Sequence, residues 1–370
     1  MPTMDNEELA LAAARSALAS LDKEALGDAQ VGLTAEGLVD TELAREVDYA
    51  LRHGDRETPL SQLTWSHVDC PTNKLDWPDG FRDTLLSGDL LIVNTFRNII
   101  LLDASNPLDM VQLHDHSSAV GRTTRIKRFG DRLFLFGDGG LEILDMAEPA
   151  SARSIAVFPS READALRSGV LHEGEFYAPI GGGIARIDLK SGERTQVAAL
   201  PPAKPGSYKG DEYGHVTEII AHGDVLVTSC RNTKVQVFQR SEGEWKSVKS
   251  ILNASCPPYL VWQTPGKSFL AADDGKVARF VLTPPKKAKR QKSVKGPAAS
   301  MGNEIVRRGD EILVAGMDRR ENLLVSVIDL SDESTLVAGP KQKLKSFIAK
   351  EQCSDSIRGL LVHGNYLLAS

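Results

Sequence analysis

The chain has 370 residues, of which 41% are hydrophobic and 25% are charged, an ordinary composition for a globular protein. It has no run of 18 or more apolar residues, and its first 21 residues carry acids where a secretion signal needs a basic start and an apolar stretch. We therefore expect no membrane-spanning helix and no conventional secretion. The four cysteines are scattered without metal-ligand spacing, which predicts a reducing, cytoplasmic compartment and indicates no metal or cofactor.

Charge divides the chain into two unequal parts at about residue 60. Residues 1–60 hold 13 acidic and five basic residues, a balance of −8, whereas the remainder is near +2. This acidic part is rich in Ala and Leu, and its apolar spacing predicts two helices, at about 6–22 and 34–53. We therefore predict two units, an acidic helical segment over 1–60 and a second domain over 61–370.

A repeat dominates the second part. Apolar strands run into a turn with a glycine followed by a polar residue, and successive turn glycines are 42, 44, 49, 43, 43 and 55 residues apart. A second turn, rich in Gly, Asn and Asp, follows each of the first six by eight to eleven residues. Units of this length with several short strands are typical of β-propeller blades. The turn glycines are Gly88, Gly130, Gly174, Gly223, Gly266, Gly309 and Gly364.

The third strand of four units ends in Asp: 99–103 (IILLD), 141–145 (LEILD), 184–188 (IARID) and 325–329 (VSVID). With its following Glu148-Pro149, the unit 130–145 resembles an LVIVD-type β-propeller repeat, and the resemblance extends over roughly 80–370. It weakens in the fourth and fifth units, which lack the Asp. It implies a propeller and no single activity. Endings typical of WD40 blades, regular quinoprotein tryptophans and sialidase Asp-boxes are absent.

Six complete units and half of a seventh predict an all-β, seven-bladed propeller, with six or eight blades as the alternatives. The missing outer strands of the last blade require another source. Either the extended segment 63–68 closes the ring, or the chain is the N-terminal fragment of a longer protein.

Candidate binding residues gather where loops enter the innermost strands. The long connection 201–215 contains amphipathic and charged side chains that commonly anchor partners. Arginines also stand five to seven residues before several turn glycines, where a cationic ring would favour carboxylates or phosphates, unless the arginines pair with local acids. The predicted partner-binding residues are Tyr208, Lys209, Tyr213, His215, Arg82, Arg125, Arg167 and Arg358.

Two other features have a structural and a functional interpretation. His114-Asp115-His116 puts two rings on one face of an extended segment, which could begin a metal site, but no third ligand is indicated. His172, His222 and His363 each lie just before a turn glycine, a position that favours a turn-stabilising role.

A basic segment lies in the fifth unit, at Lys286, Lys287, Lys289, Arg290, Lys292 and Lys295. Nucleic-acid phosphates are possible ligands for such a patch. Its position instead favours the outermost strand of a blade, where lysines prevent edge-to-edge aggregation. No aromatic residues are interleaved, which argues against single-strand stacking.

The sequence therefore predicts a protein-interaction module, a propeller that scaffolds or sequesters a regulatory protein through its channel-mouth loops. The cationic residues suit an acidic partner, no catalytic residue is assigned, and nucleic acid is disfavoured. One alternative is a propeller hydrolase or lactonase with a channel-bound cation held by Asp211, Glu212 and His215. Another is a nucleic-acid-associated factor that uses segment 286–295.

Overall fold

A computed structural model gives the arrangement of the helices and of most of the repeat. It describes residues 6–38, 42–53, 59–63, 83–95, 97–160, 168–180, 183–200, 216–230, 235–241, 243–251, 259–264, 266–273, 276–283, 287–290, 293–295, 305–317, 323–332, 336–344, 360–363 and 366–369.

The N-terminal segment forms three helices, α1 (Asn6–Ser20), α2 (Lys23–Ala35) and α3 (Glu42–His53). The prediction of two helices is therefore wrong. Asp22 starts α2 by accepting a hydrogen bond from the Ala25 N–H at 2.8 Å, and Gly37, with φ +70°, lies in the turn after that helix. A single helix over 34–53 is excluded because its first residues belong to the end of α2.

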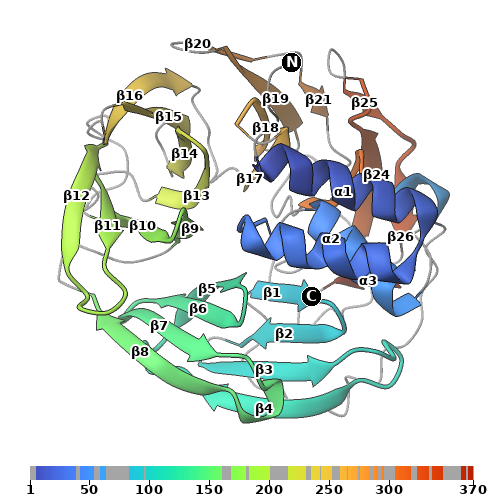
Figure 1. Ribbon diagram of the computed structural model, residues 1–370, viewed down its shortest axis with the longest axis horizontal. Helices are drawn as coiled ribbons and strands as arrows, with labels where there is room; N and C mark the ends of the chain where they lie inside the picture. Colours follow the sequence, from blue (N-terminus) through green and yellow to red (C-terminus); the bar gives the residue numbers. More distant parts are fainter. Residues whose placement is uncertain are drawn as a thin grey trace.

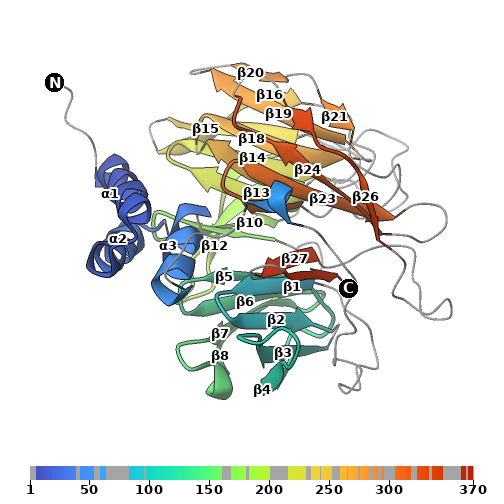
Figure 2. The same cartoon turned by 90° about the vertical axis from the view of Figure 1, so that its right-hand side faces the viewer.

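The repeat folds into six sheets of four or five strands, arranged as the blades of a ring, and one two-stranded sheet; the helices lie on one side of that ring (Figures 1 and 2). Each of the first four blades is a four-stranded antiparallel sheet. Blade 1 has β1 (Asp83–Ser87), β2 (Leu90–Asn94), β3 (Asn98–Asp103) and β4 (Val111–Ser117); blade 2 has β5 (Thr123–Phe129), β6 (Arg132–Gly137), β7 (Gly140–Asp145) and β8 (Arg153–Pro159). Blade 3 has β9 (Val170–His172), β10 (Glu175–Ile180), β11 (Gly183–Ile187) and β12 (Arg194–Ala199); blade 4 has β13 (Val216–His222), β14 (Val225–Cys230), β15 (Val235–Ser241) and β16 (Glu244–Ile251).

Blades 5 and 6 each have five strands, because two short segments share the third strand as partner. Blade 5 has β17 (Tyr259–Thr264), β18 (Ser268–Asp273), β19 (Lys276–Thr283), β20 (Lys287–Arg290) and β21 (Val294–Lys295). Blade 6 has β22 (Ile305–Arg308), β23 (Glu311–Met317), β24 (Leu323–Asp329), β25 (Val337–Ala338) and β26 (Gln342–Leu344).

In the part of the last repeat that the structure describes, β27 (Leu360–His363) and β28 (Tyr366–Ala369) form a two-stranded sheet, and β27 lies between β22 and β1. The described residues thus form six blades, and the prediction of seven is corrected. Among the described residues, no third strand pairs with this sheet. A short helix, η1 (Leu60–Gln62), packs beside this sheet, with Leu60 and Leu63 in a buried cluster that includes Val362. Residues 64–68 of the predicted closing strand lie outside the described residues.

The turn glycines occupy matching positions in all six blades. Each lies between the first and second strands with φ between +50° and +75°, a conformation that costs glycine little and other residues more. These glycines are Gly88, Gly130, Gly174, Gly223, Gly266 and Gly309. The predicted repeat register is therefore confirmed.

The terminal Asp of the third strand also has a structural role. Asp103, Asp145 and Asp329 each accept a hydrogen bond at Oδ1 from the backbone N–H two residues later, at 2.9, 3.1 and 2.8 Å. This Asx turn directs the chain from the third strand toward the outer strand. The Asp of the repeat therefore stabilises the turn between the third and the outer strand of the blade.

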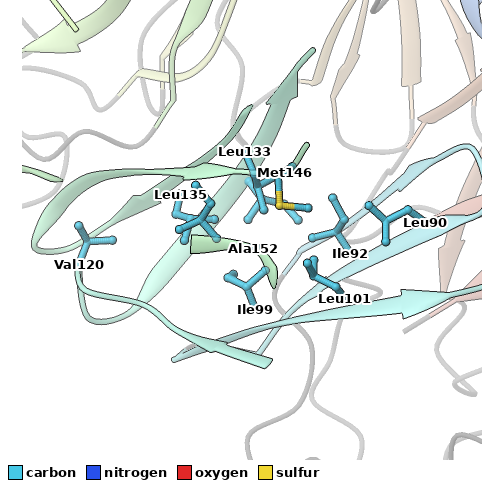
Figure 3. Close-up of a cluster of buried hydrophobic side chains, with 11 residues drawn as sticks. Leu90, Ile92, Ile99, Leu101, Val120, Leu133, Leu135, Met146 and Ala152 are labelled. Atoms are coloured by element: carbon cyan, nitrogen blue, oxygen red, sulfur yellow. The ribbon is translucent and has the colours of Figure 1, made fainter. Parts of the chain in front are cut away.

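The core of the propeller consists of layers between neighbouring blades. Leu133, Phe134, Leu135 and Phe136 on β6 are all fully buried, because side chains on both faces of the strand pack against an adjacent sheet. Figure 3 shows the layer between blades 1 and 2. Helices α1–α3 have a separate core made only of their own residues and Leu38.

Candidate functional site

Charged side chains from three blades and a serine from a fourth meet at the axis of the ring. Asp83 begins β1, Arg125 and Lys127 lie on β5, and Glu218 lies near the start of β13. Ser168, just before β9, hydrogen-bonds Glu218 Oε1 at 3.3 Å. We refer to these five residues as the axial network.

Lys127 is the centre of the axial network. Its Nζ lies 2.5 Å from Glu218 Oε1, 2.9 Å from the Gly169 carbonyl oxygen and 3.3 Å from the Ile219 carbonyl oxygen. An ammonium group has three protons, and these three acceptors match them. Burial lowers the pKa of Lys127, while the Glu218 carboxylate opposes that effect.

Glu218 is held by two cations at once. Arg125 Nη1 donates to Glu218 Oε2, and the side chain of Glu218 is only 11% exposed. Burial alone would raise the pKa of Glu218, but the charges of Lys127 and Arg125 and their hydrogen bonds keep it below its usual value. The carboxylate is therefore ionised at neutral pH and joins blade 2 to blade 4.

Asp83 extends the axial network to blade 1. Its Oδ2 accepts the Ile126 N–H of β5 at 2.8 Å, and its Oδ1 accepts the Thr84 N–H at 3.1 Å. Burial raises the pKa of Asp83 to about 6, although Arg125 acts in the opposite direction. The network thus contains two carboxyl groups and two cations, which balance when Asp83 is ionised.

A second buried polar cluster joins blades 1 and 2 farther from the axis. Glu142 on β7 is fully buried and accepts hydrogen bonds from His116 Nε2 at 2.9 Å and from the Ala119 N–H at 2.7 Å. Burial tends to raise the pKa of Glu142, but these hydrogen bonds hold it below its usual value. His116 thus forms a hydrogen bond that joins two blades. The described residues contain no group of three potential metal ligands.

Of the predicted partner-binding residues, Arg125 is the one that the structure describes. Its contact with Glu218 is an ion pair between distant blades, which the sequence offers no spacing signal to find. The others lie outside the described residues: Tyr208, Lys209, Tyr213, His215, Arg82, Arg167 and Arg358. Their partner-binding role stays a prediction, as does the cation site at Asp211, Glu212 and His215.

The basic segment falls at the edge of blade 5, where the repeat register puts it. Lys287, Lys289 and Arg290 belong to β20, the outermost strand, and Lys295 is exposed on β21. Lys286 and Lys292 lie outside the described residues. Nucleic-acid binding by this segment stays a prediction.

Histidines just before the turn glycines contact the next unit around the ring. His172 Nε2 lies 2.8 Å from the Gly223 carbonyl oxygen, and His363 Nε2 lies 3.4 Å from Asp89 Oδ1. His222 Nε2 instead pairs with Glu7 Oε1 of α1 at 3.1 Å, which links the helical segment to blade 4. These contacts support the structural interpretation of the three histidines.

Exposed aliphatic side chains cluster on the outer edge of blades 1 and 2, which sequence reasoning missed. Val111 and Leu113 lie on β4, and Ile155 and Val157 lie on β8, where Val111 is 56% exposed and Val157 is 45% exposed. Leu108 precedes β4 and is exposed as well. The two strands lie side by side in Figures 1 and 2, and β4 also contacts the turn that leads into β8. We refer to these five residues as the rim patch.

Both strands of the rim patch contain a β-bulge at an equivalent position. Gln112 and His114 pair with consecutive residues of β3, so Leu113 is the extra residue, and Ile155 is the extra residue between Ser154 and Ala156 on β8. A bulge redirects a side chain and interrupts strand pairing. It is therefore the bulges that direct these two aliphatic side chains outward.

No helix among the described residues is long and apolar enough to cross a membrane. No protein-family model and no curated protein matches the chain.

Solved structures share the propeller fold. The chain is similar to a putative 6-phosphogluconolactonase from Bacteroides fragilis, with a TM-score of 0.52 and 12% identity over 72% of this chain and 85% of that one. It is similar to a hypothetical selenium-binding protein from Sulfolobus tokodaii, with a TM-score of 0.53 and 12% identity over 70% and 76%. A protein from Lactobacillus plantarum gives a TM-score of 0.54 and 9% identity over 72% and 85%. At such low identity these likenesses establish a β-propeller fold alone.

Proposed function

We propose that this propeller is a protein-binding scaffold and that the rim patch is a surface through which it holds a partner. The observation that carries this proposal is the concentration of exposed aliphatic side chains on two adjacent outer strands. Val337 of β25 is the one other large aliphatic residue of the described blades with comparable exposure. Exposed aliphatic side chains gathered on neighbouring strands are typical of protein-binding sites.

The axial network supports a scaffolding role. Its cations and carboxyl groups bind one another, and all three protons of the Lys127 ammonium have acceptors within the protein. A network that joins blades 1 to 4 holds those blades in fixed relation. It thereby holds their outer strands rigid, which lowers the conformational entropy that the propeller itself loses when a partner binds.

A hydrolase is the second candidate, favoured by one observation. Asp83 is a buried carboxyl group with a pKa of about 6 beside the Arg125 guanidinium, which suits a general base next to an anion-binding group. The structural likeness to a putative lactonase is compatible with it. Hydrolysis of a lactone or ester would be lost in Asp83→Asn, whereas partner binding would not.

The experiment that tests the scaffold proposal is affinity capture of the full chain with matched variants. The test variant combines Leu113→Lys and Ile155→Lys, and the control combines Val31→Lys and Val337→Lys, which are aliphatic positions elsewhere that are more exposed than the test positions. Captured proteins are identified by mass spectrometry, purified, and mixed with the chain for size-exclusion chromatography.

We expect at least one partner to form a stoichiometric complex with wild type and control and to be lost from the test variant. All four positions are exposed, so neither variant should lower stability by more than about 0.5 kcal/mol per substitution. If every captured protein binds the test variant as well as wild type, the rim patch is not the binding surface and the proposal fails.

A further inference from the structure

The rim patch lies in an acidic surrounding. Between Ile99 and Val120 the sequence has three aspartates and no lysine or arginine. Asp109 and Asp115 are exposed there, each two residues along the chain from Val111 or Leu113. A ligand that covers these aliphatic side chains therefore meets a negative field, which favours basic partners.

Blade 2 continues this charge pattern. Asp145 and Glu148 precede β8, and the guanidinium of Arg153 lies 3.9 Å from Asp145 Oδ2. Arg153 is the only cation of 138–159, so acidic groups outnumber basic groups on both sides of the patch. The N-terminal helical segment, with its balance of −8, is therefore a poor occupant for the patch of a second copy.

The bulges decide between two ways of binding a segment. An added strand needs an uninterrupted edge, but Leu113 and Ile155 break the pairing pattern in the middle of β4 and β8. A helix satisfies its own backbone hydrogen bonds and is recognised through side chains, which the bulges present. The patch is thus built for side-chain contacts.

We propose that the rim patch binds a basic amphipathic helix of a partner protein, with the apolar stripe of that helix on Leu113 and Ile155 and its lysines or arginines facing Asp109 and Asp115. This inference rests on the proposed function and names the chemistry of the partner. It differs from the acidic partner expected for the channel-mouth loops, because it concerns another surface.

Fluorescence anisotropy with labelled synthetic peptides tests the inference on the full chain. The first probe is a leucine–lysine peptide with helical periodicity. The second replaces every lysine by glutamate, and the third alternates valine and lysine so that it is extended. Each peptide is titrated against wild type, Leu113→Lys with Ile155→Lys, Asp109→Asn with Asp115→Asn, and the control Val31→Lys with Val337→Lys.

We expect the basic helical peptide alone to bind wild type and the control variant. Its affinity should fall at least about tenfold in the Leu113/Ile155 variant, because apolar contacts are lost and two repulsive charges are added. It should fall about threefold in the Asp109/Asp115 variant, and that difference should shrink in 1 M salt, where the Debye length is about 3 Å.

Equal affinity for the acidic helical peptide, or tighter binding of the extended peptide, would overturn the inference. So would unchanged affinity in the Leu113/Ile155 variant. If capture yields a partner lost in that variant while no basic helical peptide binds, the partner chemistry is wrong and the scaffold proposal stands. If sedimentation shows that wild type self-associates through the patch, the occupant is a second copy, and the inference also fails.

Discussion

Lys127 of blade 2 binds Glu218 of blade 4, with 2.5 Å between Nζ and Oε1, although blade 3 lies between them. Gly169, just before the inner strand of blade 3, supports this reach because its carbonyl oxygen accepts a hydrogen bond from Lys127 Nζ at 2.9 Å. A Cβ at that position would lie 2.3 Å from the ring of Phe176, so the layer between blades 2 and 3 requires the same glycine. The axial network and the core therefore depend on one residue.

Lys127→Met should destabilise the propeller by about 3–5 kcal/mol, the usual cost of removing one partner of a buried ion pair. The variant leaves Glu218 buried with less compensating charge and leaves two carbonyl oxygens without their donor. Chemical denaturation followed by tryptophan fluorescence measures the loss. The matched control is Lys246→Met, whose ammonium is exposed and lies 3.8 Å from Glu244, and which should cost less than about 0.5 kcal/mol.

A double-mutant cycle separates pair energy from packing. If the axial network acts as a unit, Lys127→Met combined with Glu218→Gln should cost clearly less than the sum of the two single changes. Additive losses would show that Lys127 and Glu218 contribute independently, and the ion-pair explanation would then be abandoned.

Asp83→Asn should change how stability depends on pH. The pKa of Asp83 is about 6 in the fold against an ordinary 3.8, so its stabilising contribution is complete below about pH 4 and is lost as pH rises through 6. Asparagine retains an acceptor for the Ile126 N–H but carries no charge. The variant should therefore gain up to about 3 kcal/mol relative to wild type between pH 4 and pH 7.5. Denaturant unfolding of both proteins across this range measures the difference, and a pH-independent difference would contradict it.

Glu142→Gln should weaken the joint between blades 1 and 2 by about 1–3 kcal/mol at pH 7, because a buried charge-assisted hydrogen bond to His116 is lost. The pKa of Glu142 is lower in the fold than its ordinary value. Its stabilising contribution is therefore present above about pH 4.5 and is lost as pH falls through the lowered pKa.

Thermal unfolding at pH 7 and near pH 3 measures the effect of this substitution. The deficit of the Glu142→Gln variant should be large at pH 7 and should shrink at the lower pH. Glu244→Gln, an exposed change, serves as the control at pH 7. A Glu142→Gln deficit that stays the same at both pH values would rule out the ionised carboxylate as the source of stability.

The blade architecture could be predicted from the sequence because local interactions specify it. Gly88 and Gly130 adopt the positive φ that their turns need, and Asp145 caps its own strand, so each signal lies within a few residues of its effect. The way in which the ring closes could not be predicted from such local signals. Leu60 and Val362 come together from opposite ends of the chain, and sequence spacing contains no information on such a contact.

The sites were harder to predict for the same reason. Arg125 was selected for its position on an inner strand, but its partner Glu218 comes from a blade two units away. The rim patch was missed because Val111 and Val157 resemble the inner-strand residues of any blade, and only the three-dimensional arrangement shows which are exposed. Helix α2 was missed because residues 23–33 were assigned to neither predicted helix, and the predicted helix 34–53 began too early, before Gly37.

Leu18→Ala tests whether the helical segment and the propeller are separate units, as the division at residue 60 predicts. Leu18 is buried among residues of the helices, and no residue of a blade belongs to that core. Loss of its side chain should cost the helices about 2–5 kcal/mol and leave the blades unaffected.

All four tryptophans lie beyond residue 60, so their fluorescence reports on the second part alone, while circular dichroism at 222 nm follows the helices. The variant should lose its helical signal at a lower temperature while the fluorescence transition stays in place. Leu135→Ala, in the layer between blades 1 and 2, should instead lower the fluorescence transition. If Leu18→Ala lowers both transitions together, the helices and the propeller unfold as one cooperative unit and the predicted boundary is wrong.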